Sequence, residues 1–490
     1  MFTRNHQGHL SNLTLAIWLA VSLLGLAVGF LAGVQPLYLA LCTGAVVVVL
    51  SLFKNFELTV LGLLVLRSAL DPFSEQQLPG AFALGVDGLT VLYISVKVWM
   101  RQQVYTDAFW WFFAGWVALQ GLWVLLLPLG GLGMDSSALP NGLREWLRMC
   151  SWVMMYLLVM QLKPITSPQR VISWLFWALA IPLAVAAVQL LAPSLLPPIL
   201  TGSAGEYAQI AAPDQVASRI RGTLGLANTF ASFLVVFILL SWWQVKQSRQ
   251  YLPWLILIGL QVVLLINTKS LFSLIMMAVG VIATIAPQVS LASLIGGLGL
   301  VVAFISLFAS TDSGQERLGS LAATPLLNPD MDVSRAILLA ETDNNSFNWR
   351  IAQWTFLLQA WEQYPILGYG LLTCAQLTVL KNYAHNEYIR ALTEGGIVGL
   401  FLFLLLLGVM FMYLIGLFQK SAAGSAQRDF CTTLLAILLA MIVGMITENI
   451  WTHTTLFYYW WTLMAVAGWD WKESSQSEGV VDKQQMQVYQ

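Results

Sequence analysis

Long apolar segments recur along this chain and are separated by shorter polar connections. Most are roughly 18 to 22 residues long, the length that a helix needs to cross the hydrocarbon core of a bilayer. The segments lie near residues 13–33, 36–53, 56–70, 82–100, 108–129, 145–162, 171–192, 224–244, 252–268, 271–287, 289–309, 396–418, 430–447 and 454–470. Because the third is short and the first two are closely joined, the pattern predicts about 12–14 transmembrane helices.

The chain is therefore predicted to be an all-α, polytopic integral membrane protein. The same pattern divides it into a transmembrane helix bundle (1–309), a large loop (310–395), C-terminal transmembrane helices (396–470) and a tail (471–490). The run at 13–33 is too long for the core of a signal peptide, so we interpret it as the first span. The tail is polar and rich in Gln and Ser, which predicts disorder.

Composition agrees with this class and excludes others. The chain is 58% hydrophobic and only 10% charged, and its mean hydropathy is +0.74. The net charge is −1 and no run rich in Lys and Arg occurs, so nothing indicates a nucleic-acid partner. The four cysteines are far apart and form no CxxC pair, so neither a disulfide framework nor a metal cluster is predicted.

The cations in the short connections predict the orientation. Alternate connections carry Lys54, then Lys97 and Arg101, Lys163 and Arg170, Lys246 and Arg249, and Lys420 and Arg428. Since short cytoplasmic loops are enriched in Lys and Arg, these connections and both termini are expected on the cytoplasmic side. Segments 193–223 and 310–395 are then expected outside.

Two arginines close the first outer segment. Arg219 and Arg221 precede an apolar run, and two residues separated by one position cannot share a helical face. They can converge only from a loop, where they would form a guanidinium fork for a diphosphate. Snorkelling toward lipid headgroups is the alternative explanation.

The second outer segment contains a predicted helix. Phe347, Ile351, Trp354, Leu358 and Trp361 follow a helical spacing, and Pro365 ends the pattern. Such a helix is expected to lie flat at the outer interface with its Trp residues at headgroup depth and with Arg350, near the stripe's edge, pointing toward the membrane surface. The other face carries Asn348, Gln353, Gln359 and Glu362.

His385 lies near the end of the same segment. It is one of only four histidines, and no second His or Cys stands at ligand spacing, so no His-based metal site is predicted. A purely structural, hydrogen-bonded His is the alternative to a catalytic one. Glu387, Arg390 and Glu394 follow at the spacing of a charged helical face, which also fits a simple ion-pair ladder.

Three stretches together resemble the O-antigen ligase and O-antigen polymerase (Wzy-like) family of bacterial membrane glycosyltransferases. They are Arg219-x-x-Gly222-Thr223 with Asn228 and Ala231, then Arg350-x-x-x-Trp354 with Pro365-x-x-Gly368-x-Gly370, then His385-Asn386-x-Tyr388-Ile389 with Glu394-x-Gly396-x-x-Gly399. The matched region is roughly residues 215–400, and it is their order and spacing that make the combination specific. The resemblance implies a GT-C-like architecture with one large, helical periplasmic loop.

The resemblance also implies a reaction. Such enzymes transfer a glycan from undecaprenyl diphosphate to an acceptor sugar hydroxyl at the outer face of the inner membrane, without nucleotide, cofactor or metal. Arg219, Arg221 and Arg350 would bind the diphosphate and stabilise its charge as it leaves. His385 would act as base or orient a substrate, with Glu394 as a second candidate base. Asn228, Asn386 and Tyr388 would support the site.

One position departs from the family's pattern. Where the family commonly has a Ser-Arg pair at the outer end of a mid-chain helix hairpin, this chain has Lys269-Ser270. Lys269 would supply a cation for the diphosphate, but an ammonium is a point charge without the bidentate fork. A snorkelling interfacial Lys is the alternative.

Other functions fit parts of the pattern. Outer arginines also suit a transporter of bicarbonate or another small anion, although transporters usually place their polar elements near the membrane midplane. A non-catalytic scaffold of a polysaccharide export complex is the other alternative. Within the enzyme hypothesis, a ligase and a polymerase differ only in the acceptor, a glycolipid such as lipid A core or another lipid-linked glycan. The span number favours the polymerase of exopolysaccharide or lipopolysaccharide biosynthesis, with a flippase and a chain-length regulator as further partners.

Overall fold

The computed structural model describes residues 36–201, 219–286, 291–322, 335 and 346–471. All regular structure in these ranges is helical and contains no strand, which confirms the all-α prediction. The chain divides into two compact units, residues 1–60 and 61–490. The predicted first span and the tail from residue 472 lie outside the described residues.

The described helices follow the predicted apolar segments closely. The first unit contains α2 (Pro36–Lys54) and the start of α3 (Phe56–Arg67). The longer helices that follow are α4 (Leu78–Trp99), α5 (Ala108–Leu129), α6 (Leu139–Met160), α7 (Pro168–Trp177), α8 (Ala180–Leu191), α11 (Ala227–Gln247), α12 (Leu252–Asn267), α13 (Leu271–Ile285), α14 (Leu291–Ala309), α15 (Asp312–Ala322), α17 (Ser346–Gln363), α18 (Glu387–Lys420), α19 (Ala426–Gly444) and α20 (Thr454–Ala467). Each predicted span from residue 36 onward therefore coincides with a helix or, at 171–192, with a pair of helices.

Six of the described helical segments have the length and composition to cross a membrane. They are α4, α5, the α7–α8 pair, α11, α18 and α19, and the shorter α12 and α13 are also apolar. The fold is that of a polytopic helical membrane protein. The predicted total of 12–14 crossings and the orientation remain predictions.

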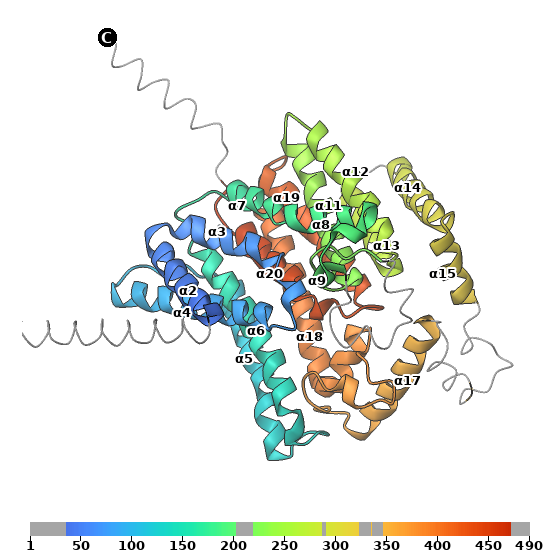
Figure 1. Ribbon diagram of the computed structural model, residues 1–490, viewed down its shortest axis with the longest axis horizontal. Helices are drawn as coiled ribbons and strands as arrows, with labels where there is room; N and C mark the ends of the chain where they lie inside the picture. Colours follow the sequence, from blue (N-terminus) through green and yellow to red (C-terminus); the bar gives the residue numbers. More distant parts are fainter. Residues whose placement is uncertain (1–35, 202–218, 287–290, 323–334, 336–345, 472–490) are drawn as a thin grey trace, which may run out of the picture. The chain divides into compact units, whose positions relative to one another are not determined.

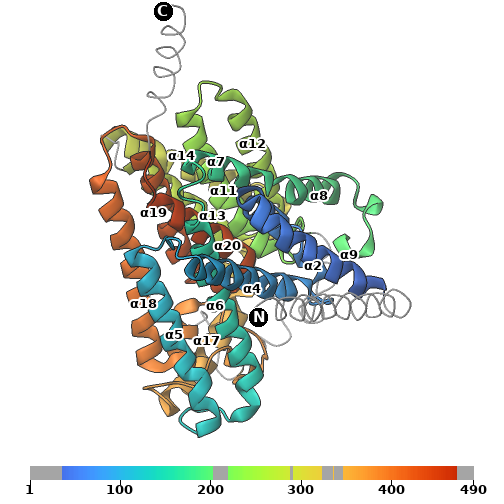
Figure 2. The ribbon, with the colours of Figure 1, turned by 90° about the vertical axis from the view of Figure 1, so that its left-hand side faces the viewer.

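Helix α20 forms the centre of the second unit (Figure 1). Every residue from Thr455 to Ala467 is buried, as expected for a helix that is apolar all round. It packs against α6, while α11 packs against α12 and α19 packs against both α13 and α18. Viewed from the side, α5, α6, α17 and α18 lie together in one part of this unit (Figure 2).

The predicted span 171–192 is interrupted between α7 and α8. Pro182 has no N–H, so the carbonyl four residues earlier loses its helical hydrogen bond, and the proline ring also crowds that carbonyl. That carbonyl belongs to Ala178, and it accepts a hydrogen bond from Ser68 Oγ at 2.8 Å instead. A polar side chain from α3's C-terminal end thus satisfies the backbone group that the proline leaves unpaired.

Helix α17 spans the predicted apolar stripe and buries residues from both of its faces. Its fully buried residues are Asn348, Ala352, Gln353 and Leu357. The predicted apolar stripe is only partly covered, and Leu358 on it is exposed. On the polar face, Gln353 is buried because it has partners there, donating to Asn382 O at 2.6 Å and accepting from Thr378 Oγ1 at 2.8 Å, whereas Gln359 and Glu362 are exposed. The placement of this helix at the membrane interface stays a prediction.

Helix α18 begins inside the predicted loop and bends at Gly396. Gly396 has φ +64°, and a β-carbon there would overlap Ile366 O. The bend lets the segment 365–370 pair with it: Ile397 N–H donates to Pro365 O at 2.9 Å and Gly370 N–H donates to Glu394 O at 2.8 Å. The Pro-x-x-Gly-x-Gly turn and the glycines of α18 are thus two halves of one backbone junction.

Candidate functional site

His385 lies in the turn immediately before α18, in a strained backbone conformation. Its φ is +47°, a region that side chains other than glycine rarely adopt. Its N–H donates to Asn449 Oδ1 at 2.8 Å, and its Nδ1 lies 3.3 Å from Glu448 Oε1. The ring also meets Trp349 of α17 edge-on, with centroids 5.4 Å apart. The connection between α19 and α20 therefore holds both the backbone and the ring of His385.

Glu448 is the acceptor around which this site is organised. Its carboxylate accepts hydrogen bonds from its neighbour Asn449 N–H at 3.0 Å and from Asn228 Nδ2, and it lies within ion-pair distance of His385. Burial alone would raise the pKa of Glu448, but His385, His453 and Arg350 outweigh burial and lower this pKa to about 2. Glu448 is thus a permanent carboxylate at neutral pH.

Arg219 reaches the same carboxylate through Asn228. Its Nη2 donates to Asn228 Oδ1 at 2.6 Å, and its Nε donates to Thr268 O at 2.8 Å. Thr268 precedes Lys269 in the turn between α12 and α13, where Lys269 has φ +53°. Arg219 and Lys269 are both predicted to bind the diphosphate. The structure brings their segments together, because Arg219 binds the carbonyl of the residue that precedes Lys269.

Arg350 approaches from α17. Its charge contributes to the lowered pKa of Glu448, and its neighbour Trp349 contacts the His385 ring. Trp354, one turn further on, donates to Ala384 O at 2.7 Å, so α17 also supports the backbone just before His385. Arg350 therefore acts electrostatically on Glu448, and its predicted direction toward the membrane surface stays a prediction.

Arg221 lies in the same loop as Arg219 but has different surroundings. The Gln189 side chain accepts from the N–H groups of Arg221 and Gly222 at 3.0 and 2.9 Å, which fixes the loop. One buried Nη atom of Arg221 has no hydrogen-bond partner among the residues that the structure describes. Burial lowers the pKa of Arg221.

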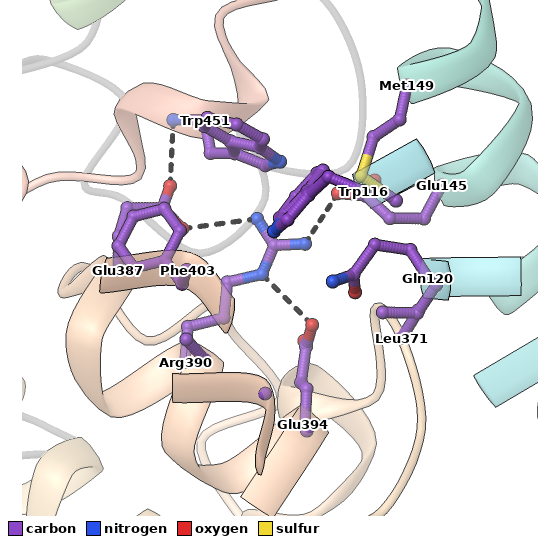
Figure 3. A pocket seen from close by; sticks show the side chains of 13 residues that line it. Trp116, Gln120, Glu145, Met149, Leu371, Glu387, Arg390, Glu394, Phe403 and Trp451 are labelled. Atoms are coloured by element: carbon purple, nitrogen blue, oxygen red, sulfur yellow. Dashed lines mark hydrogen bonds and ion pairs between the residues drawn. The ribbon is translucent and has the colours of Figure 1, made fainter. Parts of the chain in front are cut away.

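Glu394 belongs to a separate, buried ion cluster. Arg390 donates to Glu394 at 3.1 Å, to Glu387 at 3.3 Å and to Glu145 of α6 at 2.7 Å (Figure 3). The predicted ladder is therefore confirmed, and Glu145 extends it. The cluster borders a cavity of about 60 Å³, also lined by Trp116, Gln120 and Trp451. Glu394 is occupied by Arg390 and by Cys374 N–H at 3.3 Å, which favours a structural role over that of a base.

The remaining predicted residues support the start of α18. Asn386 caps the helix, accepting from Tyr388 and Ile389 N–H groups, both at 3.0 Å. The Tyr388 hydroxyl donates to Ile442 O of α19 at 2.7 Å. Both residues thereby orient the turn that carries His385.

Reasoning from sequence missed Glu448, Asn449 and His453. His453 is buried and its Nδ1 lies 3.0 Å from Ser232 Oγ; burial, more than any other influence, lowers its pKa to about 4, so it is neutral. A signal was present, because Glu448-Asn449 is a polar pair in a short connection between two apolar segments on the predicted outer side. Nothing local to that pair distinguishes it from an ordinary exposed turn.

The fold and the site define a polytopic membrane protein that gathers arginine, histidine and carboxylate side chains at helix ends. Residues 216–404 match the family model described as O-antigen ligase. This segment is therefore O-antigen ligase/polymerase-like, which confirms the predicted resemblance. Arg219, Arg350 and His385 fall inside the match, whereas Glu448 and Asn449 lie beyond its end. No curated protein matches the chain significantly.

Proposed function

We propose that this protein transfers a glycan from undecaprenyl diphosphate to an acceptor sugar hydroxyl at the outer face of the bacterial inner membrane. The observation that carries the proposal is the chain of contacts Arg219–Asn228–Glu448–His385, with Arg350 acting on the same carboxylate. It gathers cations suited to a diphosphate and a histidine suited to a hydroxyl proton in one place.

His385 is assigned the role of general base. Its Nδ1 faces Glu448, so its Nε2 is the ring nitrogen left to meet a substrate. A carboxylate behind a histidine orients the ring and stabilises the imidazolium that forms when the other nitrogen takes up a proton. Because Glu448 stays ionised at neutral pH, it can do this throughout the working range.

The proposed step balances in atoms and charge. The acceptor hydroxyl oxygen attacks the anomeric carbon, and the bond from that carbon to the diphosphate oxygen breaks. The hydroxyl proton passes to His385 Nε2, and undecaprenyl diphosphate leaves with the bonding electron pair. Arg219 and Arg350 stabilise the charge that develops on the leaving group, and such help is strongest in a partly dehydrated site.

The test is a pair of His385 variants in purified, membrane-reconstituted protein supplied with a lipid-linked glycan and an acceptor. We expect His385→Ala to abolish transfer while protein yield, membrane insertion and donor binding persist. His385→Gln keeps hydrogen bonding but cannot accept a proton at neutral pH, so it is expected to be equally inactive. Full activity of the Gln variant would assign His385 an orienting role and remove the general base.

The acceptor separates a ligase from a polymerase. The glycan profile of a strain lacking the protein distinguishes them: capped single repeats identify a polymerase, and unattached full-length chains identify a ligase. We expect the first outcome, in keeping with the large predicted number of spans.

A further inference from the structure

Asn228 joins the cationic and the acidic halves of the site with a single amide. Its Oδ1 accepts from Arg219 at 2.6 Å, and its Nδ2 donates to Glu448 Oε2. The two partners fix the orientation of the amide, because a guanidinium only donates and a carboxylate only accepts. The residue is the second of α11, and Ser232 Oγ donates to its carbonyl at 3.0 Å, so a rigid element places the amide.

We propose that Asn228 is a positioning residue for transfer. It holds the Arg219 guanidinium in one orientation for the donor's diphosphate and keeps the second oxygen of Glu448 occupied, so that the first faces His385. This inference rests on the proposed function and adds to it a requirement for an amide at this position. An amide is the uncharged side chain that offers an acceptor and a donor at one planar end.

The isosteric change Asn228→Asp makes the requirement measurable. The new carboxylate would still accept from Arg219, but its second oxygen would face Glu448 Oε2, and two carboxylates in contact cannot both stay ionised without strong repulsion. Among the described residues, the charged and titratable groups around the pair are Arg219 from the loop before α11, Arg350 from α17, His385 from the turn before α18, and His453 from the α19–α20 connection. Arg148 of α6 and Asp71, which follows α3, act on His453 in turn. The Asp71 carboxylate is already paired with Arg67 at 2.6 Å.

A shared proton would restore the contact between the two carboxylates, so the defect should depend on pH with a defined sign. At high pH both groups are ionised and push apart, which displaces Arg219 and Glu448. At low pH the pair binds one proton and the hydrogen bond returns. We expect transfer by the variant to fall about 30-fold relative to the wild type near pH 8 and to recover as pH falls toward about 6.

The experiment measures kcat and KM of full-length protein in nanodiscs, with lipid-linked glycan and acceptor, as a variant-to-wild-type ratio at each pH. The ratio cancels any pH dependence that the two proteins share. The matched control is Asn267→Asp, whose amide donates to Val263 O at 2.8 Å and meets no carboxylate in the described structure; its ratio should stay flat. Asn228→Leu, which keeps the size but has no polar atoms, should be impaired at every pH.

A double variant tests the coupling itself. In Asn228→Asp/Glu448→Gln one carboxylate remains, and the new amide can donate to Asp Oδ2, so the ratio should lose its pH dependence although activity stays low. A flat ratio for Asn228→Asp alone, with His385→Ala and Arg219→Lys inactive, would overturn the positioning role and leave the proposed function standing. If those two variants also retained full transfer, the proposed function would fall as well.

Discussion

At the scale of single residues, the site depends on a short connection that holds a strained histidine. Asn449 fixes the backbone of His385 and Glu448 fixes its ring. A non-glycine residue with positive φ persists only where its surroundings determine it, so the strain supports a functional reading of this turn.

The negative charge of Glu448 beside His385 is constant at neutral pH. The pKa of Glu448 is lowered from 4.5 to about 2, so its contribution to stability is fully present above about pH 4.5 and is lost only as pH falls toward 2. A change in the pH profile of transfer near neutrality therefore does not report the titration of Glu448.

Arginine itself, and not merely a positive charge, is expected to matter at Arg219 and Arg350. Lysine keeps the charge but lacks the planar fork that matches phosphate oxygens and, at Arg219, also bridges Asn228 and Thr268. We predict that Arg219→Lys and Arg350→Lys each lower the transfer rate roughly 30- to 160-fold, equivalent to about 2–3 kcal/mol. The measurement is initial rate with saturating acceptor. Near-normal rates for both would show that the arginine fork is not needed for transfer and would leave Arg219 only the structural role of holding Asn228 and Thr268.

At the scale of elements, the junction between segment 365–370 and the bend of α18 positions the second half of the large loop. It anchors the chain just after α17 against the helix whose first turn follows His385. The junction needs glycine in both segments. Gly368 and Gly396 have φ of +66° and +64°, and a β-carbon on either residue would overlap backbone atoms of the other segment.

Gly396→Ala is therefore expected to destabilise the protein by about 1–3 kcal/mol or more, through backbone strain and steric overlap. The control is Gly408→Ala in the same helix, where a β-carbon has nothing within 4 Å and alanine should be neutral or slightly stabilising. Thermal unfolding of detergent-solubilised protein compares the two. Equal melting temperatures would show that the junction contributes little to stability.

At the scale of the whole molecule, the site assembles from the ends of helices in the second unit. Arg219 precedes the start of α11, Thr268 follows the end of α12, His385 precedes α18, and Glu448 follows α19. If these helices cross the membrane, the four ends belong to one face, which agrees with the predicted placement of all four segments outside.

Cysteine labelling tests that placement. In a cysteine-free background, Val379→Cys, whose native side chain is 65% exposed, is expected to react with a membrane-impermeant thiol reagent in intact spheroplasts. Gln250→Cys, in the exposed connection between α11 and α12, is expected to react only after lysis. The reverse pattern would invert the orientation and place the site in the cytoplasm.

The sequence by itself determined the positions of the helices and many of the residues that form the site. Helices of membrane-crossing length can be located from hydropathy alone, because burial in lipid requires nearly every residue of a span to be apolar. The ladder of Glu387, Arg390 and Glu394 was equally readable, since its spacing is local to one helix. The motifs around Arg219, Arg350 and His385 carried the resemblance to the O-antigen ligase family, whose model matches residues 216–404.

Only the tertiary structure decided which side chains complete the site. Asn228 is 220 residues from Glu448, and His385 is 64 residues from Asn449. No local spacing in the sequence therefore predicts either contact. The burial of Gln353 on the polar face of α17 was not predictable for the same reason, because residues 378 and 382 supply its partners. Hydrophobic periodicity predicts which face of a helix is apolar and so favours burial. Which polar side chains can be buried depends on hydrogen-bond partners from distant segments, which the periodicity does not show.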